Sequence, residues 1–241
     1  MRLLVSVRGS LEARAAVAGG ADVVDAKDPA LGALGAVRAD RLAAIRRAVG
    51  AARPVSAALG DARDEASVAA AAAAVAEVGV AFVKLGLGGV TSDARAQHLA
   101  RVARRAAGAA TALVLVAYAD WRRATSLAPR RLVAVAAEAG AVGLLLDTAW
   151  KDAPLFALLS SDAVASWVAA VRAAGLFAAL AGSLLGRDFA TARALGAELV
   201  GVRGAACIGG RTGRVSRDRV AALQRLVRAA PAPTLPLGVF A

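Results

Sequence analysis

The sequence predicts a single (β/α)8 barrel, the TIM-barrel architecture, on three observations. Short runs rich in leucine and β-branched residues alternate with longer stretches of helical period from one end of the chain to the other. The short runs are apolar on both faces, which is typical of parallel strands covered by helices. Eight such units within 241 residues, with no linker or shift in composition, favour one closed barrel over an open doubly wound sheet.

Each repeating unit contributes one expected strand and one expected helix. The strands are predicted at residues 3–7, 23–27, 54–59, 82–86, 112–117, 142–147, 177–181 and 199–203. The helices are predicted at residues 12–18, 40–49, 65–78, 93–106, 128–139, 162–174, 187–195 and 216–229. Glycines such as Gly20, Gly140 and Gly196 follow three of these helices, where a left-handed residue ends a helix and turns the chain. Residues 1–229 are thus expected to form one domain, and the proline-rich residues 230–241 a C-terminal tail.

The charge balance points to an anionic partner. Thirty basic residues oppose eighteen acidic ones, giving a formal net charge of +12, which suits nucleic acid, an anionic membrane surface or phosphorylated small molecules. The arginines are spread over many helices with few aromatic residues between them, which argues against nucleic acid. The longest apolar stretches without charge run 14 residues, as in 106–119, too short to span a bilayer. A small phosphorylated substrate is therefore favoured, with no nucleic acid or membrane as partner.

Two features bear on the compartment. The single cysteine, Cys207, has no partner for an intramolecular disulfide. Arg8 interrupts the apolar start of the chain too early for a signal-peptide core. A cytoplasmic protein is expected.

The lysines are few and share one position in the predicted fold. Twenty-seven of the thirty basic residues are arginine, and only Lys27, Lys84 and Lys151 are lysine. Each lies at or just beyond the C-terminal end of a predicted strand, the rim on which barrels of this kind carry catalysis. Arginine stays protonated, whereas a desolvated lysine beside other cations can lose its proton and attack a carbonyl. A chance scatter of three lysines is the alternative interpretation.

Two carboxylates accompany the lysines. Asp25 and Lys27 have the same parity in one strand, so both side chains leave the same face. Asp147 closes an apolar strand four residues before Lys151, and a charge there is costly unless it is paired or functional. We expect Asp25 and Asp147 to serve in acid–base chemistry, with structural ion pairs as the alternative.

Glycine-rich loops follow the seventh and eighth strands. Gly182 and Ser183 end the seventh, and Arg203 and Gly204 end the eighth. Backbone N–H groups in these loops form the usual phosphate site of this barrel class, and Arg203 is placed to add a bidentate contact. The alternative is that the glycines serve only tight turns.

Neither a cofactor nor a metal is predicted. His98, the single histidine, lies in the middle of a predicted helix, so triads and histidine metal sites lack their parts. Cys207 has no histidine to activate it, and a small buried residue is the preferred interpretation. The glycines at 86–89 do not continue as a dinucleotide fingerprint.

Several strings in the chain are similar to those of one family. They are residues 18–29 (AGGADVVDAKDP), 83–87 (VKLGL), 118–120 (YAD), 146–149 (LDTA), 180–183 (LAGS) and 200–207 (VGVRGAAC). In this order they resemble the (5-formylfuran-3-yl)methyl phosphate synthases of methanofuran biosynthesis, over roughly residues 3–229. The loop at 8–10 and the proline-rich tail depart from the family pattern.

The resemblance implies a (β/α)8 barrel that joins two molecules of glyceraldehyde 3-phosphate, releases phosphate and water, and needs no cofactor. It implies that Lys27 forms a Schiff base with the substrate, that Lys84 accepts a proton, and that Asp147 and Lys151 act as a supporting acid–base pair. A homo-oligomer is also expected.

Two other functions stay open at the level of sequence. One is a class I aldolase or a triose-phosphate isomerase-like enzyme that acts on another phosphorylated sugar. The other is a non-catalytic barrel that binds phosphorylated sugars, in which Lys27 would form no adduct that borohydride can reduce.

Overall fold

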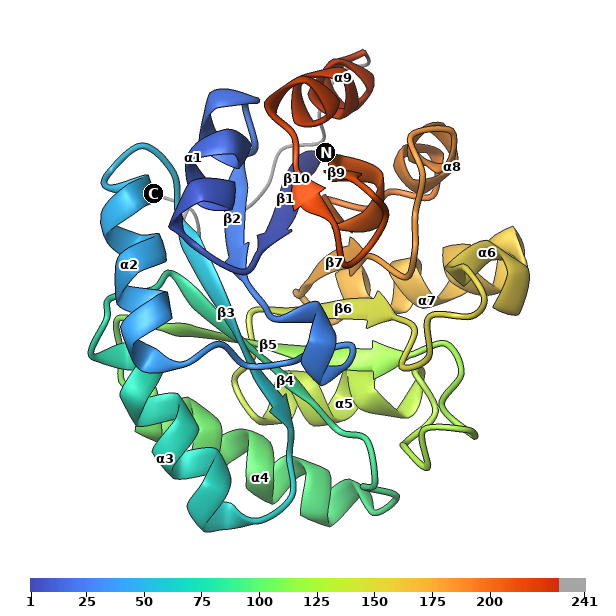
Figure 1. Cartoon of the computed structure of the whole chain (residues 1–241). Coiled ribbons are helices and arrows are strands. Elements are labelled where there is room, and N and C mark those ends of the chain that lie inside the picture. The colour runs from blue at the N-terminus through green and yellow to red at the C-terminus, as the bar shows by residue number, and fades with distance from the viewer. Residues whose placement is uncertain (230–241) are drawn as a thin grey trace.

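A computed structural model describes residues 1–229 and confirms the predicted closed barrel. Eight parallel strands pair in chain order and β8 closes on β1. Figure 1 shows the strands at the centre of the molecule. They are β1 (Arg2–Val7), β2 (Val23–Ala26), β3 (Val55–Asp61), β4 (Phe82–Gly86), β5 (Ala112–Tyr118), β6 (Gly143–Asp147), β7 (Phe177–Leu180) and β8 (Leu199–Val202). The predicted tail, residues 230–241, lies outside the described residues.

Helices surround the barrel (Figure 1). The α-helices are α1 (Ser10–Ala18), α2 (Ala39–Val49), α3 (Glu65–Ala76), α4 (Asp93–Ala106), α5 (Arg131–Glu138), α6 (Leu155–Leu158), α7 (Ser161–Ala173), α8 (Asp188–Ala194) and α9 (Arg217–Arg228). Short 3-10 turns form η1 (Pro29–Leu31) and η2 (Gly204–Ala206), and β9 (Cys207–Ile208) pairs with β10 (Arg214–Val215) as an antiparallel hairpin. None of the helices within residues 1–229 combines the length and apolarity needed to cross a bilayer.

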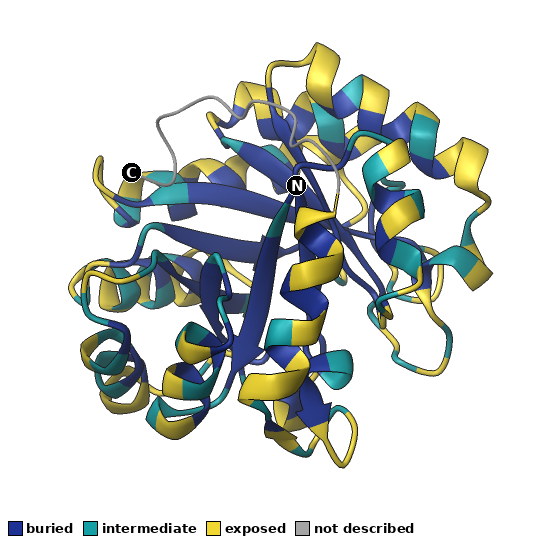
Figure 2. Ribbon diagram, turned by 90° about the horizontal axis from the view of Figure 1, so that it is seen from above, coloured by how far each residue is buried: buried dark blue, intermediate teal, exposed yellow. Residues whose placement is uncertain are grey.

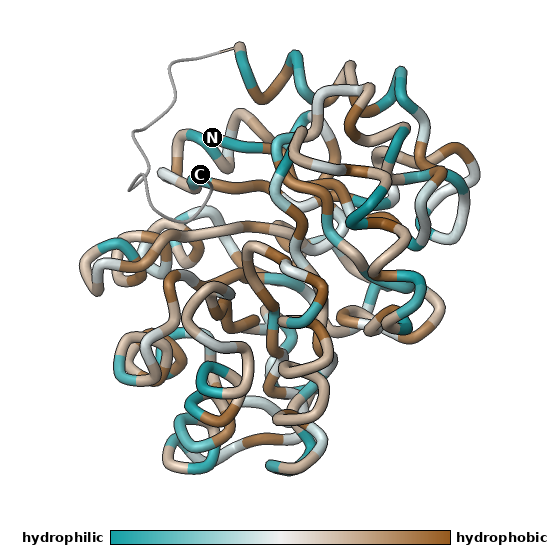
Figure 3. The backbone as a smooth tube through the Cα atoms, turned by 90° about the vertical axis from the view of Figure 1, so that its left-hand side faces the viewer, coloured by the Kyte–Doolittle hydropathy of each residue, from teal (hydrophilic) through white to brown (hydrophobic). Residues whose placement is uncertain are grey.

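The sequence specifies these helices through their ends and their apolar faces. Asp64, Ser92, Ser160 and Ser216 cap α3, α4, α7 and α9 by accepting a hydrogen bond from a backbone N–H of the first turn. Along the helices, hydrophobic and hydrophilic residues alternate (Figure 3). The apolar residues pack against the strands and the polar ones face outward, so that the strands are buried and the helices exposed on one side only (Figure 2).

The interior of the barrel is a second apolar cluster, separate from the layer between strands and helices. Alternate residues of each strand point inward, among them Leu4, Phe82, Val114, Leu145 and Phe177. Polar and charged residues replace the apolar ones toward the C-terminal ends of several strands. This arrangement gives the barrel an apolar floor and a charged mouth.

Candidate active site

A cavity of about 160 Å³ opens at the C-terminal ends of the strands. Its floor is apolar and includes Phe82, Val114, Leu145, Phe177 and Leu199. The polar and charged side chains that line it are those of Ser6, Lys27, Lys84, Asp147, Lys151, Ser183, Arg203 and Arg211. All three lysines of the chain therefore meet in one cavity, at the rim where the sequence places them.

Asp25 lies fully buried on β2 and forms the centre of one charged group. Its carboxylate accepts hydrogen bonds from the Ser6 and Ser56 hydroxyls, each at 2.8 Å, and from Lys84 Nζ at 2.6 Å. The strand register makes this possible, because Ser6 and Ser56 are the partners of Asp25 on β1 and β3. Burial alone would raise the pKa of Asp25, yet the positive charges of Lys84 and Lys27 hold it below its ordinary value.

Asp147 and Lys151 form a second charged group. Asp147 ends β6, which lies across the barrel from β2. Lys151 Nζ donates to Asp147 Oδ1 at 2.6 Å and to the carbonyl of Thr148 at 2.6 Å. The backbone N–H of Thr148 also donates to Asp147 at 2.7 Å. Burial opposes ionisation of Asp147, but Lys151 and Lys27 lower the pKa of its carboxyl below the usual range. Asp147 and Lys151, four residues apart in the sequence, thus form an ion pair.

Lys27 differs from the other two lysines. It follows β2, is 8% exposed, and within residues 1–229 its amine makes no ion pair of the kind that holds Lys84 and Lys151. Burial, together with the positive charge of Lys84, lowers the pKa of Lys27 to about 7, and Asp147 only partly opposes this. A large fraction of Lys27 is therefore a neutral amine near pH 7, the form that attacks a carbonyl.

The loop after β7 has a strained backbone beside the cavity. Gly182 has φ +92° and Ser183 has φ +56°, a left-handed conformation that is uncommon for a residue with a side chain. A Cβ at Gly182 would lie 2.9 Å from Cγ2 of Thr148. Gly182, Ser183 and Gly204 all line the cavity, as the sequence predicts.

Arg203, for which the sequence predicts a phosphate contact, lines the cavity, but its N–H groups already have protein acceptors. All five of its N–H bonds donate to the protein: to the Glu12 carboxylate twice, at 2.9 and 3.3 Å, and to the carbonyls of Ser6, Arg211 and Gly213. The positive charge of Arg203 offsets the burial of Glu12 and keeps the pKa of that carboxyl low. A bidentate phosphate contact needs a pair of N–H bonds that Arg203 does not have here, so we assign it to holding the loops together.

Arg211 at the cavity and Tyr118 in the barrel interior have at most a weak signal in the sequence. Arg211 lines the cavity from the β9–β10 hairpin, and nothing in its surroundings distinguishes it from the other arginines. Buried Tyr118, the register partner of Asp147, donates to Asp61 Oδ1 at 2.7 Å. Burial and the negative charge of Asp61 raise the pKa of Tyr118 well above its ordinary value, which keeps its hydroxyl as a donor. An aromatic residue ending an apolar strand was the available signal for Tyr118.

His98 and Cys207, for which the sequence predicts no catalytic role, do not line the cavity. His98 is exposed on α4, 2.9 Å from Glu65. Cys207 is buried, and burial raises the pKa of its thiol. Within residues 1–229, no three His, Cys, Asp or Glu side chains gather closely enough to hold a metal ion.

Fold and site together define a (β/α)8-barrel protein whose mouth holds two lysine–carboxylate pairs and a third lysine with a pKa lowered to about 7. The family model described as 4-HFC-P synthase matches residues 3–224. The (5-formylfuran-3-yl)methyl phosphate synthase of Methanopyrus kandleri is 42% identical over 94% of this chain and 96% of its own length. That of Methanothermobacter thermautotrophicus is 38% identical over 94% and 99%. The chain belongs to the (5-formylfuran-3-yl)methyl phosphate synthase family.

Solved structures with lower sequence identity share the fold. The phosphoribosyl anthranilate isomerase of Thermus thermophilus superposes with a TM-score of 0.62 at 15% identity, over 95% of this chain and 99% of that chain. At this identity the likeness concerns the barrel alone.

Proposed function

We propose that this protein condenses two molecules of glyceraldehyde 3-phosphate into (5-formylfuran-3-yl)methyl phosphate through a Schiff base on Lys27, as a step of methanofuran biosynthesis. The observation that carries the proposal is the buried Lys27 amine with a pKa of about 7, in a cavity that Lys84, Asp147 and Lys151 also line. The names of the relatives support the product, and the cationic cavity supports phosphorylated substrates. Because the reaction eliminates phosphate, the enzyme is a carbon–oxygen lyase.

The carbon skeleton of the product dictates which bonds form. Its furan ring carries the formyl and phosphomethyl groups on two carbons separated by one CH. The first triose therefore supplies the formyl carbon and two ring carbons after it loses its phosphate. The second triose keeps its phosphate and joins through its central carbon. The new carbon–carbon bond links C3 of the first triose to C2 of the second, which must react as the ketose isomer.

Lys27 starts the reaction on the first triose. Its neutral amine adds to the aldehyde and loses water to give an imine, whose nitrogen is an electron sink. Lys84 donates its proton to the hydroxyl that leaves as water when the imine forms, and its neutral amine then removes the proton from C2. The carboxylate of Asp25 stabilises the ammonium form of Lys84 before and after this exchange. The electron pair passes through the nitrogen and expels phosphate from C3. This leaves an enol with a nucleophilic C3.

The second triose completes the ring. Lys84 passes the first proton to the departing phosphate and is neutral again. It then moves the C2 proton of the second triose to C1, while the C2 hydroxyl loses a proton and the C1 oxygen gains one, which gives the ketose. The enol carbon of the first triose attacks the C2 carbonyl of this ketose. The C1 hydroxyl of the second triose then closes on the C2 carbonyl of the first. Lys151, paired with Asp147, supplies protons for the two dehydrations. Hydrolysis of the imine frees Lys27, and the sum is one phosphate and two waters per furan, with no oxidant or reductant.

The loops after β7 and β8 complete the proposed site. Backbone N–H groups around Gly182, Ser183 and Gly204 would hold one substrate phosphate, since all three residues line the cavity near the lysines. Holding the phosphate there fixes the aldehyde relative to Lys27.

The test combines product formation with trapping of the imine. Purified protein is incubated with glyceraldehyde 3-phosphate, and the absorbance of the furan aldehyde and the release of phosphate are followed together. A second sample is quenched with borohydride, and its peptides are analysed by mass spectrometry. We expect furan and phosphate in equal amounts and a reduced adduct on Lys27.

Substitutions of Lys27 sharpen this test. Lys27→Ala and Lys27→Arg should both abolish turnover, because a guanidinium forms no imine. A Lys27→Arg variant with near wild-type rate would remove Lys27 from the mechanism. An adduct without furan would indicate the aldolase alternative, and neither signal would indicate a barrel that only binds its ligand.

A further inference from the structure

Arg211 occupies a position that the mechanism above does not use. It lies in the turn between β9 and β10, is half-buried, and lines the cavity with the three lysines. Burial lowers the pKa of Arg211, and the negative charge of Asp147 partly opposes this. The guanidinium of Arg211 thus interacts electrostatically with a charged residue of the cavity. The side chain therefore brings a fixed positive charge to the cavity from outside the barrel strands.

The side chain of Arg211 bridges two loops above the site. Its Nη1 donates to the carbonyl of Pro29 at 2.8 Å and its Nη2 to that of Gly32 at 2.7 Å. Pro29 follows Lys27 by two residues, so the bridge fastens the segment that immediately follows Lys27. Within residues 1–229, the Nε–H and one N–H on each Nη of Arg211 have no protein acceptor, and these three donors remain for a ligand.

Hydrogen bonds from Arg203 fix the backbone of the hairpin that carries Arg211. Arg203 donates to the carbonyl of Arg211 itself at 2.7 Å and to that of Gly213 at 3.0 Å. A Cβ at Gly213 would lie 1.9 Å from the carbonyl oxygen of Ile208, so the tight turn requires glycine there. The buried Arg203–Glu12 pair thus positions Arg211, which lines the cavity and, unlike Arg203, does not use all of its N–H groups on the protein.

We propose that Arg211 binds the phosphate of a triose phosphate in the cavity while it holds the loop at residues 29–32 beside Lys27, and so selects phosphorylated aldehydes over unphosphorylated ones. This inference rests on the proposed function for the identity of the substrate. A guanidinium suits the task, because it can donate to two carbonyls and to a phosphate at the same time, whereas an ammonium is a point charge. The reaction brings two phosphates into the site, and the glycine loops provide for only one.

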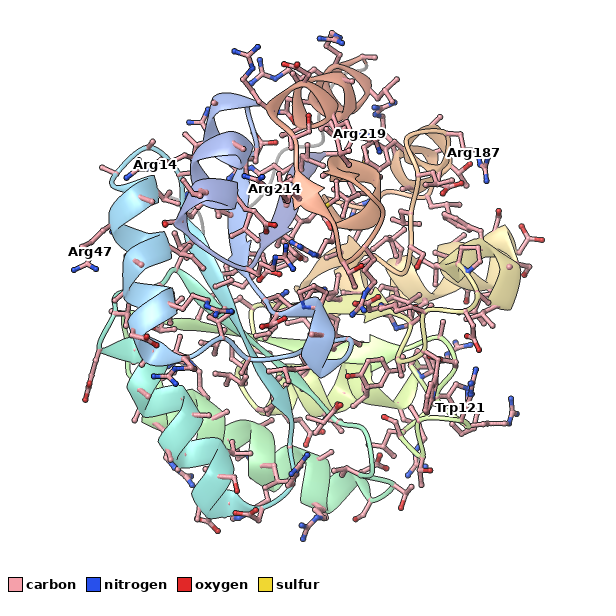
Figure 4. All side chains as sticks on the ribbon, viewed as in Figure 1. Arg14, Arg47, Trp121, Arg187, Arg214 and Arg219 are labelled. Carbon is pink, nitrogen blue, oxygen red and sulfur yellow. The ribbon has the colours of Figure 1, made fainter. Side chains whose placement is uncertain are left out.

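The test uses the full chain and a ligand that cannot react. Glycerol 3-phosphate has the phosphate of the substrate but no carbonyl, and its binding is measured by calorimetry for wild type, Arg211→Gln, Arg211→Lys and Arg214→Gln. Arg214 lies on the same hairpin, is exposed and does not line the cavity, so it controls for net charge (Figure 4). We expect Arg211→Gln to weaken binding about 10- to 100-fold, Arg211→Lys to be intermediate, and Arg214→Gln to match wild type.

A second measurement separates phosphate recognition from support of the loop. The rate of borohydride trapping on Lys27 is compared for glyceraldehyde 3-phosphate and for unphosphorylated glyceraldehyde. Arg211→Gln should slow trapping of the phosphorylated aldehyde only. Equal slowing with both aldehydes would mean that Arg211 only positions the loop and would overturn the proposal, as would wild-type binding of glycerol 3-phosphate by Arg211→Gln. Neither readout depends on furan formation, so a wild type that makes no furan would overturn the proposed function alone.

Discussion

The environment of each lysine decides what that lysine can do. The amines of Lys84 and Lys151 lie 2.6 Å from the carboxylates of Asp25 and Asp147, and each forms an ion pair there. Lys27 has the same apolar floor beneath it but lacks such a contact within residues 1–229. Three residues of one type thus acquire different chemistry from partners that lie on other strands.

The pKa of Lys27 predicts a pH dependence. The rate of adduct formation with unphosphorylated glyceraldehyde should rise through pH 7 and level off above it, because the neutral amine is the nucleophile. This aldehyde avoids the titration of a substrate phosphate in the same range. Trapping with borohydride at a series of pH values gives the midpoint, and a midpoint near that of an ordinary lysine, about 10.4, would contradict the prediction.

The Lys84→Met variant extends this prediction. The positive charge of Lys84 helps to lower the pKa of Lys27, so its removal should move the midpoint to higher pH. An unchanged midpoint would mean that the charge of Lys84 does not contribute to the lowered pKa of Lys27.

The buried amine should also destabilise the fold. The folded pKa of Lys27 lies below its unfolded value of 10.5, so the unfolded chain binds the proton more tightly. The penalty is complete below about pH 7, and it vanishes as the pH rises toward 10.5. Lys27→Met should therefore raise the free energy of unfolding by about 1–2 kcal/mol at pH 7, and by less at pH 9. Urea unfolding at the two pH values measures this, and a gain that grows with pH would refute the assignment.

At the scale of elements, the strands and main helices could be predicted because each has its own local signal. Apolar runs and terminal glycines locate all eight barrel strands and eight of the helices to within a few residues. The helix α6 and the β9–β10 hairpin were missed. A strand of two residues shows no alternation, and a helix of one turn shows no period, so tertiary contacts alone define them.

The candidate site was predictable where it depends on strand ends and unpredictable where it depends on distant contacts. The parity of Asp25 and Lys27 and the position of Lys84 follow from the strands alone. The role of Arg203 does not, because its partner Glu12 lies 191 residues away in sequence. Arg211 reaches the loop at 29–32 from about as far. A pattern of neighbouring residues cannot predict contacts between residues that lie so far apart in the sequence.

The loop after β7 gives a prediction at this scale. Gly182→Ala places a Cβ 2.9 Å from Thr148 in a backbone with positive φ, which should cost about 1–2 kcal/mol of stability. The matched control is Gly175→Ala, which has a similar φ of +74° but open space around it and follows α7. Both should lose stability in urea unfolding, but only Gly182→Ala should raise KM for glyceraldehyde 3-phosphate. An equal rise of KM in both variants would mean that the loop after β7 does not bind the phosphate.

At the scale of the molecule, the protein carries a net charge of +12, and its cavity is lined by more basic than acidic side chains. Anionic substrates should be drawn toward it, and salt should screen the attraction. We expect kcat/KM for glyceraldehyde 3-phosphate to fall as ionic strength rises from about 0.01 to 0.2 M, where the Debye length shrinks from about 30 to 7 Å. Adduct formation with uncharged glyceraldehyde is the control and should not change. The homo-oligomer expected from the resemblance stays a prediction, which light scattering tests.

The scarcity of lysine gives this chain an uncommon chemical property. Every lysine ε-amine of this sequence lies in one cavity. The outer surface carries its positive charge on guanidinium groups, which acylating reagents leave untouched. An amine-selective acylating reagent can therefore serve as an active-site titrant for this protein: the fraction of molecules acylated at Lys27, located by peptide mass spectrometry, reports how many carry a competent site.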